Sequence, residues 1–282
     1  MDFKTGLLVF TFLAGCFAAP TLEAPEDDMA IFFDHTDASS RIVGGTQAAV
    51  GSHPHMVALT TGLAVRSFFC GGSLITQRTI LTAAHCIRGV FSWGSLTSSL
   101  RATVGTNRWN SGGTTYSIAR NVTHPHYVHN IIKNDIGILI TSSNVALNNL
   151  VRTVPITYSV IPGGVRSRVA GWGRIRAGGA LSANLLELFP TTLAGSDCED
   201  RIARAAVQFN SPRAHVQSHI EICTFQATNF GTCNGDSGSA LLRADNGQQF
   251  GIVSWGFPCA LGVPDMFVRI SAYQNWLRAN VV

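Results

Sequence analysis

The heptapeptide CNGDSGS at residues 233–239 is the stretch from which the fold and the chemistry of this chain can be approached. It is preceded by two other distinctive segments, LTAAHC at residues 81–86 and NDIGIL at residues 134–139. A serine hydroxyl is a weak nucleophile, and a histidine can take its proton and later return it. A buried carboxylate holds such a histidine in the required tautomer. The three segments therefore predict a catalytic triad of His85, Asp135 and Ser237.

The assignment of the aspartate rests on its sequence neighbours. Asp135 opens the apolar run 136–140, which draws its carboxylate into the interior. The other aspartates between the histidine and the serine lie in a polar stretch or adjoin the serine: Asp197, Asp200 and Asp236. The order of the triad excludes the α/β-hydrolase fold, which runs serine, aspartate, histidine and needs a glycine where this chain has Ser239.

Short apolar or alternating runs recur after residue 41, separated by turn residues such as Gly71-Gly72 and Asn246-Gly247. This pattern predicts an all-β fold. The expected strands include residues 56–59, 73–75, 79–81, 136–140, 169–170, 240–242 and 250–253. Near the end, Tyr273, Trp276, Leu277 and Val281 follow helical spacing, which predicts a short C-terminal helix.

Residues 1–18 are interpreted as a signal peptide. Lys4 precedes an apolar run at 6–17, and small residues follow it. The run is too short to span a bilayer. Secretion exposes the chain to an oxidising compartment. Once Cys16 leaves with the signal peptide, six cysteines remain, which predicts three disulfides with 15 pairings open on spacing alone.

Charge divides the rest of the chain at Arg41. Residues 19–41 carry six acidic side chains and one basic one, which favours a flexible segment. Residues 42–282 carry 18 basic and nine acidic side chains, but the arginines are dispersed, which argues against nucleic-acid binding. Only Lys133 among those 18 is a lysine. Arginine keeps its charge at higher pH, so operation at alkaline pH is one explanation and compositional bias is the other.

With the further motif RIVGG at residues 41–45, these segments resemble the trypsin/chymotrypsin family of serine endopeptidases over residues 41–282. In appearance the chain is nearest to insect, caterpillar-midgut proteases of the chymotrypsin-like or collagenolytic kind. The resemblance implies two packed six-stranded antiparallel β-barrels with a short C-terminal helix and an active site between the barrels. It implies a monomer that needs no cofactor and hydrolyses peptide bonds through an acyl-enzyme.

The resemblance also assigns roles to particular residues. The backbone N–H groups of Gly235 and Ser237 form the oxyanion hole. Residues 19–41 are an activation pro-segment, and residues 42–282 are the protease domain. A trypsin-like protease cuts after Arg41, and the new amine of Ile42 pairs with Asp236. The implied disulfides are Cys70–Cys86, Cys198–Cys223 and Cys233–Cys259.

Substrate preference is also approached through the resemblance, which places the specificity pocket at Gly231, Thr232, Ser254, Trp255, Gly256 and Asp265. Trypsin-like members have an aspartate where this chain has Gly231, so strict preference for arginine or lysine is disfavoured. The walls indicate a deep apolar slot for large apolar residues. Asp265 stands where a glycine lines the floor, a combination similar to collagenolytic relatives of broad specificity. A buried carboxylate needs a partner, and both preferences stay open.

Metal sites are not expected. The stretch between Cys86 and Asp135 has no acidic residue to hold calcium. The histidines lack companions at zinc-binding spacing and are interpreted as surface or turn residues: His53, His55, His124, His126 and His129. Asn121 begins the glycosylation acceptor NVT.

The expected partners are protein and peptide substrates, a trypsin-like activating protease and protein inhibitors of proteases, with no nucleic acid and no membrane. The short pro-segment favours a digestive enzyme secreted to the extracellular space, in the gut lumen. Two alternatives are kept. One is a homologue that binds partners without cutting them. The other is a protease dedicated to one regulatory or immune target.

Overall fold

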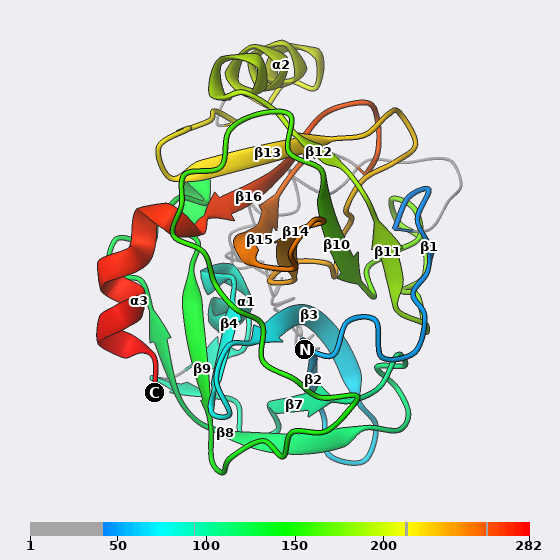
Figure 1. The fold of residues 1–282 in the computed structure, drawn as a ribbon, viewed down its shortest axis with the longest axis vertical. Coiled ribbons are helices and arrows are strands. Elements are labelled where there is room, and N and C mark those ends of the chain that lie inside the picture. The colour runs from blue at the N-terminus through cyan, green and yellow to red at the C-terminus, as the bar shows by residue number, and fades with distance from the viewer. Residues whose placement is uncertain (1–41, 93, 212–213, 258) are drawn as a thin grey trace, which may run out of the picture.

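The computed structural model describes residues 42–282 except residues 93, 212–213 and 258. The segments interpreted as signal peptide (1–18) and pro-segment (19–41) lie outside the described residues. Two barrel-like bodies of β-structure are stacked, and one helix lies along their side (Figure 1). Among the described residues, no helix has the length and apolar character needed to cross a membrane.

The first body is a closed antiparallel barrel with the strand order β2-β3-β4-β9-β8-β7. Its interior is filled by aliphatic side chains such as Val57, Leu74, Ile80 and Ile138, all fully buried. Branched side chains suit a pleated, buried surface, which explains why these runs form strands. The strands are β2 Met56–Thr61, β3 Ser67–Leu74, β4 Thr79–Thr82, β7 Arg101–Val104, β8 Thr114–Thr123 and β9 Gly137–Thr141.

The second body is an antiparallel sheet with the order β1-β11-β10-β14-β15-β16-β13-β12. Its inner face packs apolar side chains that include Val169, Leu241 and Phe267. The strands are β1 Thr46–Gln47, β10 Ser167–Gly171, β11 Leu186–Leu188, β12 Thr191–Thr192, β13 Glu221–Phe225, β14 Ala240–Arg243, β15 Gln249–Trp255 and β16 Asp265–Arg269.

Hydrogen bonds between the ends of this sheet complete a second ring. Ser167 N donates to Pro190 O (2.8 Å), and Thr192 N donates to Val165 O (3.0 Å). β11 and β12 are thus two parts of one bent strand, interrupted where Pro190 has no N–H to give to the ladder. The ring contains β10, β14, β15, β16, β13 and this bent strand. The predicted two-barrel all-β fold is confirmed.

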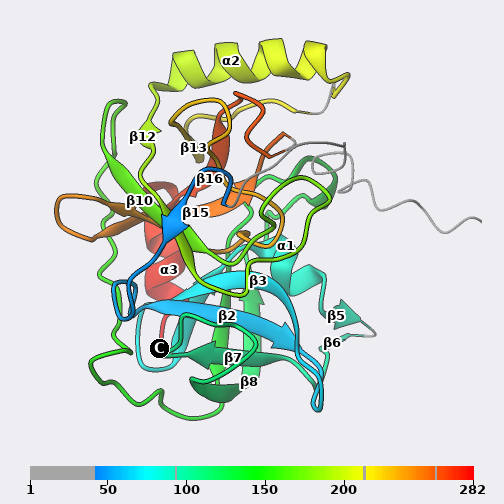
Figure 2. The same ribbon diagram turned by 90° about the vertical axis from the view of Figure 1, so that its right-hand side faces the viewer.

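The helices are few, and the sequence analysis missed the longest of them. The 14-residue helix α2, Gly195–Gln208, lies on the outside of the second barrel (Figures 1 and 2). Most of its residues are polar, so its short buried face was overlooked. That face consists of Cys198, Ile202 and Ala205, which follow helical spacing. The predicted C-terminal helix is α3, Gln274–Asn280. The remaining short elements are α1 Ala84–Arg88, η2 His129–Ile131, η3 Ile270–Tyr273, β5 Phe91–Ser92 and β6 Ser95–Leu96.

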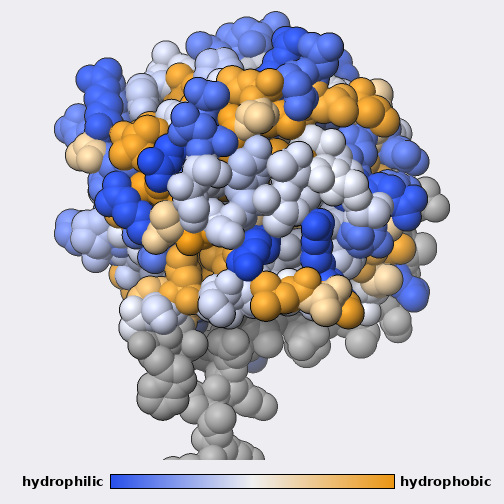
Figure 3. Space-filling model, turned by 90° about the horizontal axis from the view of Figure 1, so that it is seen from below, coloured by the Kyte–Doolittle hydropathy of each residue, from blue (hydrophilic) through white to orange (hydrophobic). Residues whose placement is uncertain are grey.

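The face seen from below, at the first-barrel end, mixes apolar and strongly hydrophilic side chains (Figure 3). Large exposed apolar residues in the sequence are dispersed, as with Val50, Leu63, Leu147 and Val160. Single exposed apolar side chains are normal on a soluble protein and need no partner to explain them.

Among the histidines that the sequence analysis expected at the surface or in turns, His53 and His55 are buried, although His55 does lie in a turn. His53 and His55 lie just before β2, and they are 6% and 4% exposed, respectively. His53 Nε2 lies 2.8 Å from Glu187 Oε2, which gives that ring a partner. Burial, together with the neighbouring His53 and Arg168, lowers the pKa of His55 to about 3. The neutral form of His55 is therefore the one that the fold accommodates.

This burial predicts a loss of stability in acid. The unfolded chain protonates His55 below its ordinary pKa of 6.5, whereas the folded chain resists protonation until about pH 3. The contribution of this group to the free energy of unfolding is therefore complete above pH 6.5. As the pH decreases below 6.5, this free energy falls by up to about 1.4 kcal/mol per pH unit. We expect His55→Asn to flatten the pH dependence of the unfolding free energy between pH 6.5 and 4.

The measurement is urea denaturation at a series of pH values. His219→Asn is the matched control, because His219 is exposed. Parallel pH profiles for His55→Asn and the parent would contradict the prediction.

Candidate active site

His85 and Asp135 are brought together by the pairing of two strands of the first barrel. Thr82 of β4 lies opposite Gly137 of β9, so α1 begins beside the residues that precede β9. Asp135 Oδ2 lies 2.7 Å from His85 Nδ1, and Asp135 Oδ1 accepts the His85 backbone N–H at 2.8 Å. The carboxylate is 1% exposed. This double contact fixes the orientation of the imidazole, and it brings together two of the three residues that the sequence analysis predicted as a triad.

A third donor reaches the same carboxylate from the second barrel. Ser254 Oγ, on β15, donates to Asp135 Oδ2 at 2.6 Å. Donors stabilise a buried carboxylate in its ionised form. The sequence analysis placed Ser254 only in the pocket wall and missed this contact, because nothing local in the sequence relates β15 to residue 135.

Ser237 lies in a tight turn before β14, held by Asp236 N to Cys233 O (2.9 Å) and Ser239 N to Asp236 O (3.0 Å). Its own carbonyl accepts the N–H of Gly71 in β3 at 2.8 Å. A side chain at Gly238, where φ is +83°, would overlap Thr82 Oγ1. The serine turn is therefore packed closely against the segment that leads into His85.

Three disulfides hold this region, with the pairing that the family resemblance implies. Cys70–Cys86 joins β3 to α1 directly beside His85. Cys198–Cys223 fastens α2 to β13. Cys233–Cys259 joins the start of the serine turn to the chain after β15. The cross-links therefore brace the histidine from one side and the serine turn from the other.

Asp236 is a fully buried carboxylate beside the serine. Gly173 N donates to its Oδ1 (2.8 Å), and Cys233 N donates to its Oδ2 (3.0 Å). Burial raises the pKa of Asp236 to about 7, and the two N–H donors oppose the shift. Its predicted partner Ile42 is also fully buried, whereas Arg41 lies outside the described residues.

The predicted oxyanion-hole residues occupy the same turn. Gly235 has φ +98°, a conformation that favours glycine. A Cβ at this position would lie 3.1 Å from Gly173 Cα and 2.9 Å from Leu181 Cδ2. The backbone of Gly235 is thus enclosed, and only Asp236 separates its N–H from that of Ser237.

Three of the predicted pocket residues, Gly231, Thr232 and Gly256, lie around Asp265, the first residue of β16, whereas Ser254 and Trp255 have their hydrogen bonds elsewhere. Thr232 N donates to Asp265 Oδ2 at 2.8 Å. A Cβ at Gly231 would lie 3.1 Å from Oδ2, and one at Gly256 would lie 3.8 Å from Oδ1. Burial raises the pKa of Asp265 to about 7, opposed by the hydrogen bonds from Thr232 and assisted by the charge of Asp236. Asp265 therefore lies between the two glycines predicted to line the pocket.

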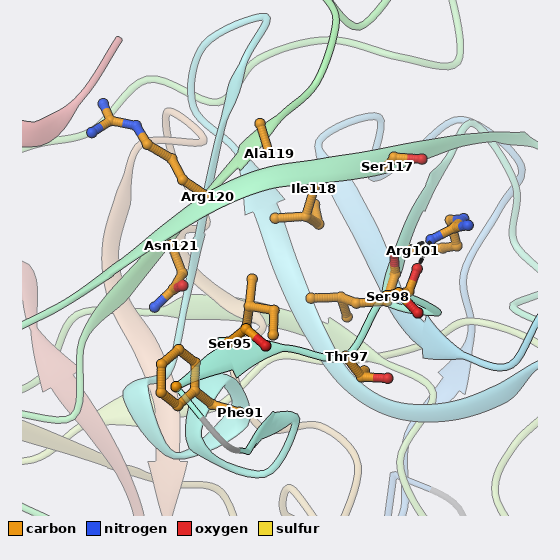
Figure 4. A pocket seen from close by; sticks show the side chains of 13 residues that line it. Phe91, Ser95, Thr97, Ser98, Arg101, Ser117, Ile118, Ala119, Arg120 and Asn121 are labelled. Atoms are coloured by element: carbon orange, nitrogen blue, oxygen red, sulfur yellow. Dashed lines mark hydrogen bonds between the residues drawn. The ribbon is translucent and has the colours of Figure 1, made fainter.

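A separate cavity of about 400 Å³ lies at the surface of the first barrel, lined by the β5–β6 hairpin, β7 and β8 (Figure 4). None of the triad or pocket residues lines it. Asn121, the predicted glycosylation acceptor, is half-buried on its wall.

In the described chain, His85 also lies near Cys70 and Cys86, but both sulfurs are engaged in a disulfide and are not metal ligands.

A pair of β-barrels with a histidine–aspartate pair and a serine turn between them is the architecture of trypsin-like endopeptidases. The family model described as Trypsin matches residues 42–277. "Trypsin, alkaline B" of Manduca sexta is 35% identical over 85% of this chain and 91% of its own length. "Chymotrypsin-2" of Vespa crabro is 33% identical over 85% and 99%. "Trypsin" of Sus scrofa is 30% identical over 87% and 98%. The chain belongs to the trypsin family of serine endopeptidases.

The space around Asp236 yields a test of the site. A Cβ at Gly173 would overlap the Asp236 carboxylate, which two backbone N–H groups hold in place. We expect Gly173→Ala to displace the serine turn and to lower kcat/KM by roughly tenfold or more, because misplacement of about 1 Å has large catalytic cost.

The measurement is peptide hydrolysis per titrated active site. Gly89→Ala is the matched control, since its Cβ would meet nothing closer than 3.5 Å. Equal activity of the two variants would show that catalysis does not require the space beside the Asp236 carboxylate to be empty.

Proposed function

We propose that the protein is a secreted serine endopeptidase, made as an inactive precursor, in which His85, Asp135 and Ser237 are the catalytic triad. The observation that carries this proposal is the hydrogen-bonded pair of His85 and buried Asp135 beside the turn of Ser237. The family, whose members are serine endopeptidases, supports the same chemistry.

The mechanism follows from the roles of these atoms. Ser237 Oγ attacks the carbonyl carbon of the scissile peptide while His85 Nε2 takes its proton. Asp135 keeps the proton on Nδ1 and stabilises the imidazolium that forms. The N–H groups of Gly235 and Ser237 stabilise the oxyanion. His85 then protonates the leaving amine, and a water molecule repeats the sequence to release the acid from the acyl-enzyme.

Activation is proposed to occur by cleavage after Arg41, by a trypsin-like protease. The amine of Ile42 then becomes a cation able to pair with Asp236. The buried setting of Asp236 and the burial of Ile42 support this role, because a buried carboxylate gains most from an opposite charge. The pro-segment 19–41 has no cysteine and therefore leaves after the cut. Protein inhibitors of proteases are the expected regulators.

The substrate preference that we propose is for large apolar residues, with arginine as an additional substrate at high pH. The names of the relatives include both trypsins and a chymotrypsin, so they do not decide the preference. Gly231 and Gly256 leave the pocket open, and Asp265 supplies one carboxylate beside it. Some relatives are called alkaline trypsins, which fits the predominance of arginine over lysine. A digestive role in the gut lumen is the proposed setting.

The triad is tested by removing its members one at a time from the activated enzyme. We expect Ser237→Ala to abolish acyl-enzyme formation. Asp135→Asn should lower kcat by about ten-thousandfold, the magnitude known for this family's triad, because the amide favours the wrong tautomer of His85. The measurement is a peptide ester assay after cleavage at Arg41, with the new Ile42 terminus verified by sequencing.

Asp197→Asn is the matched control, because Asp197 lies on α2 and its carboxylate accepts a hydrogen bond from Arg201. Lack of activity in the wild-type enzyme with a verified Ile42 terminus would instead favour the non-cutting homologue.

Asp265 predicts a specificity that changes with pH. Below about pH 7 its carboxyl is protonated and neutral, and above that it is ionised. The ratio of kcat/KM for cleavage after arginine to that after leucine should therefore rise as pH increases through about 7. Effects of pH that are common to both substrates cancel in this ratio.

The measurement compares matched peptides from pH 6 to 9. Asp265→Asn keeps the volume of the side chain and should make the ratio low and independent of pH. A ratio that still rises in this variant would place the responsible charge elsewhere.

A further inference from the structure

The lone lysine of the protease domain is buried. Lys133 and Glu221 have side chains that are 2% and 5% exposed, and Lys133 Nζ lies 2.9 and 3.0 Å from the two carboxylate oxygens. The ammonium also donates to the backbone oxygen of His215 at 2.7 Å. Placing two charges in the interior costs free energy that their attraction does not always recover. An ion pair in this position therefore invites a functional explanation.

The pair joins the two barrels and extends to Trp255. Lys133 precedes β9 of the first barrel, whereas Glu221 opens β13 of the second. Trp255 Nε1 donates to Glu221 Oε1 at 2.7 Å, and Lys133 Nζ lies 4.6 Å from the centre of the Trp255 ring. Trp255 is thus held by a hydrogen bond at its edge and by a cation over its face.

These contacts form a closed circuit with the catalytic aspartate. Lys133 is two residues before Asp135, and Trp255 directly follows Ser254, whose hydroxyl bonds Asp135 Oδ2. The circuit therefore runs from Asp135 through Ser254 and Trp255 to Glu221 and Lys133, and back along the backbone. Each barrel contributes part of it, so movement of one barrel against the other would strain it.

The backbone around Lys133 gives a reason for such a restraint. Ile132 has φ +47° and Asn134 has φ +54°. A left-handed conformation is costly for a β-branched residue such as Ile132, and it persists where the surroundings impose it. Val128 and Lys133 exchange two backbone hydrogen bonds (2.9 and 3.2 Å), and Asn134 Nδ2 donates to His126 O (2.8 Å). The ion pair adds the side-chain anchor between these two strained positions.

We propose that Lys133 and Glu221 are positioning residues, which act through Trp255 and Ser254 to hold the carboxylate of Asp135 against His85. Neither residue touches the substrate or the reacting atoms. The proposal rests on the proposed triad, and it adds a dependence of that triad on an ion pair between the barrels. The charged groups near the lysine are Glu221 from β13 and Asp135 from its own segment. Tyr273 from η3 is near both carboxylates.

The test neutralises the pair without emptying its space, using Lys133→Met/Glu221→Gln. The methionine fills the volume of the lysine stem, and the glutamine keeps an acceptor for Trp255. We expect the thermal unfolding temperature to change little, because buried pairs can be replaced by packed neutral groups. We expect kcat/KM to fall by roughly tenfold to a hundredfold. The acidic limb of its pH profile should move to lower pH, because a displaced Asp135 stabilises the imidazolium of His85 less.

Matched variants give the control and the second measurement. Arg201→Met/Asp197→Asn removes an exposed ion pair on α2 and should leave both readouts unchanged. If the double variant does not fold, Lys133→Gln/Glu221→Gln replaces it, because it also neutralises both charges together. Both double variants remove one positive and one negative charge, so the net charge near His85 is unchanged and a displaced Asp135 carboxylate is left as the cause of a shifted acidic limb. Lys133→Arg keeps the charge and should retain the wild-type limb.

An unchanged acidic limb in the folded variants would overturn the proposal, whether or not kcat/KM falls, because the effect then does not pass through Asp135. The wild-type enzyme is measured in the same assay. An inactive wild type would refute the proposed triad itself, whereas an active wild type with unaffected variants would refute only the role of the ion pair.

Discussion

The rest of the structure depends on the burial of one carboxylate, that of Asp135, at the junction of the two barrels. Its oxygens accept hydrogen bonds from the His85 backbone and ring on one side and from Ser254 on the other. A carboxylate that is 1% exposed is tolerable only when its oxygens are satisfied. Because the donors come from both barrels, the barrels must meet in one relative position for the charge to be accommodated. The same hydrogen bonds to Asp135 thus fix both the orientation of His85 and the relative position of the two barrels.

Two further carboxylates, the fully buried Asp236 and the half-buried Asp265, lie against glycines, which leave room for them because they have no side chain. Asp236 is surrounded by Gly171 and Gly173, and Asp265 lies beside Gly231. In each case backbone N–H groups take the place of water as donors. Both carboxyl groups have pKa values raised toward neutrality by burial. Their ionisation therefore depends on what enters the space beside them, a cation at Asp236 or a substrate side chain at Asp265 in the proposed function.

Features encoded by local sequence were predictable, whereas features that depend on distant pairing were not. Apolar runs such as residues 79–81 and 250–253 lie within strands β4 and β15, and the choice of Asp135 agrees with its contact to His85. Strand β8 was not predicted because all ten of its residues are exposed or half-buried. Helix α2 escaped because its buried stripe is short. No local pattern relates Ser254 to Asp135 or Glu221 to Lys133, which lie 119 and 88 residues apart.

The scarcity of lysine has a consequence for the covalent chemistry of the surface. Residues 42–282 contain a single lysine, and its ammonium is enclosed by Glu221, the His215 carbonyl and the Trp255 ring. The protease domain therefore presents no lysine amine to reagents that acylate or cross-link primary amines. Enzymes that cut after lysine likewise find no accessible lysine in the folded domain. The folded surface is therefore resistant to proteases that cut only after lysine, while it keeps a net positive charge through arginine.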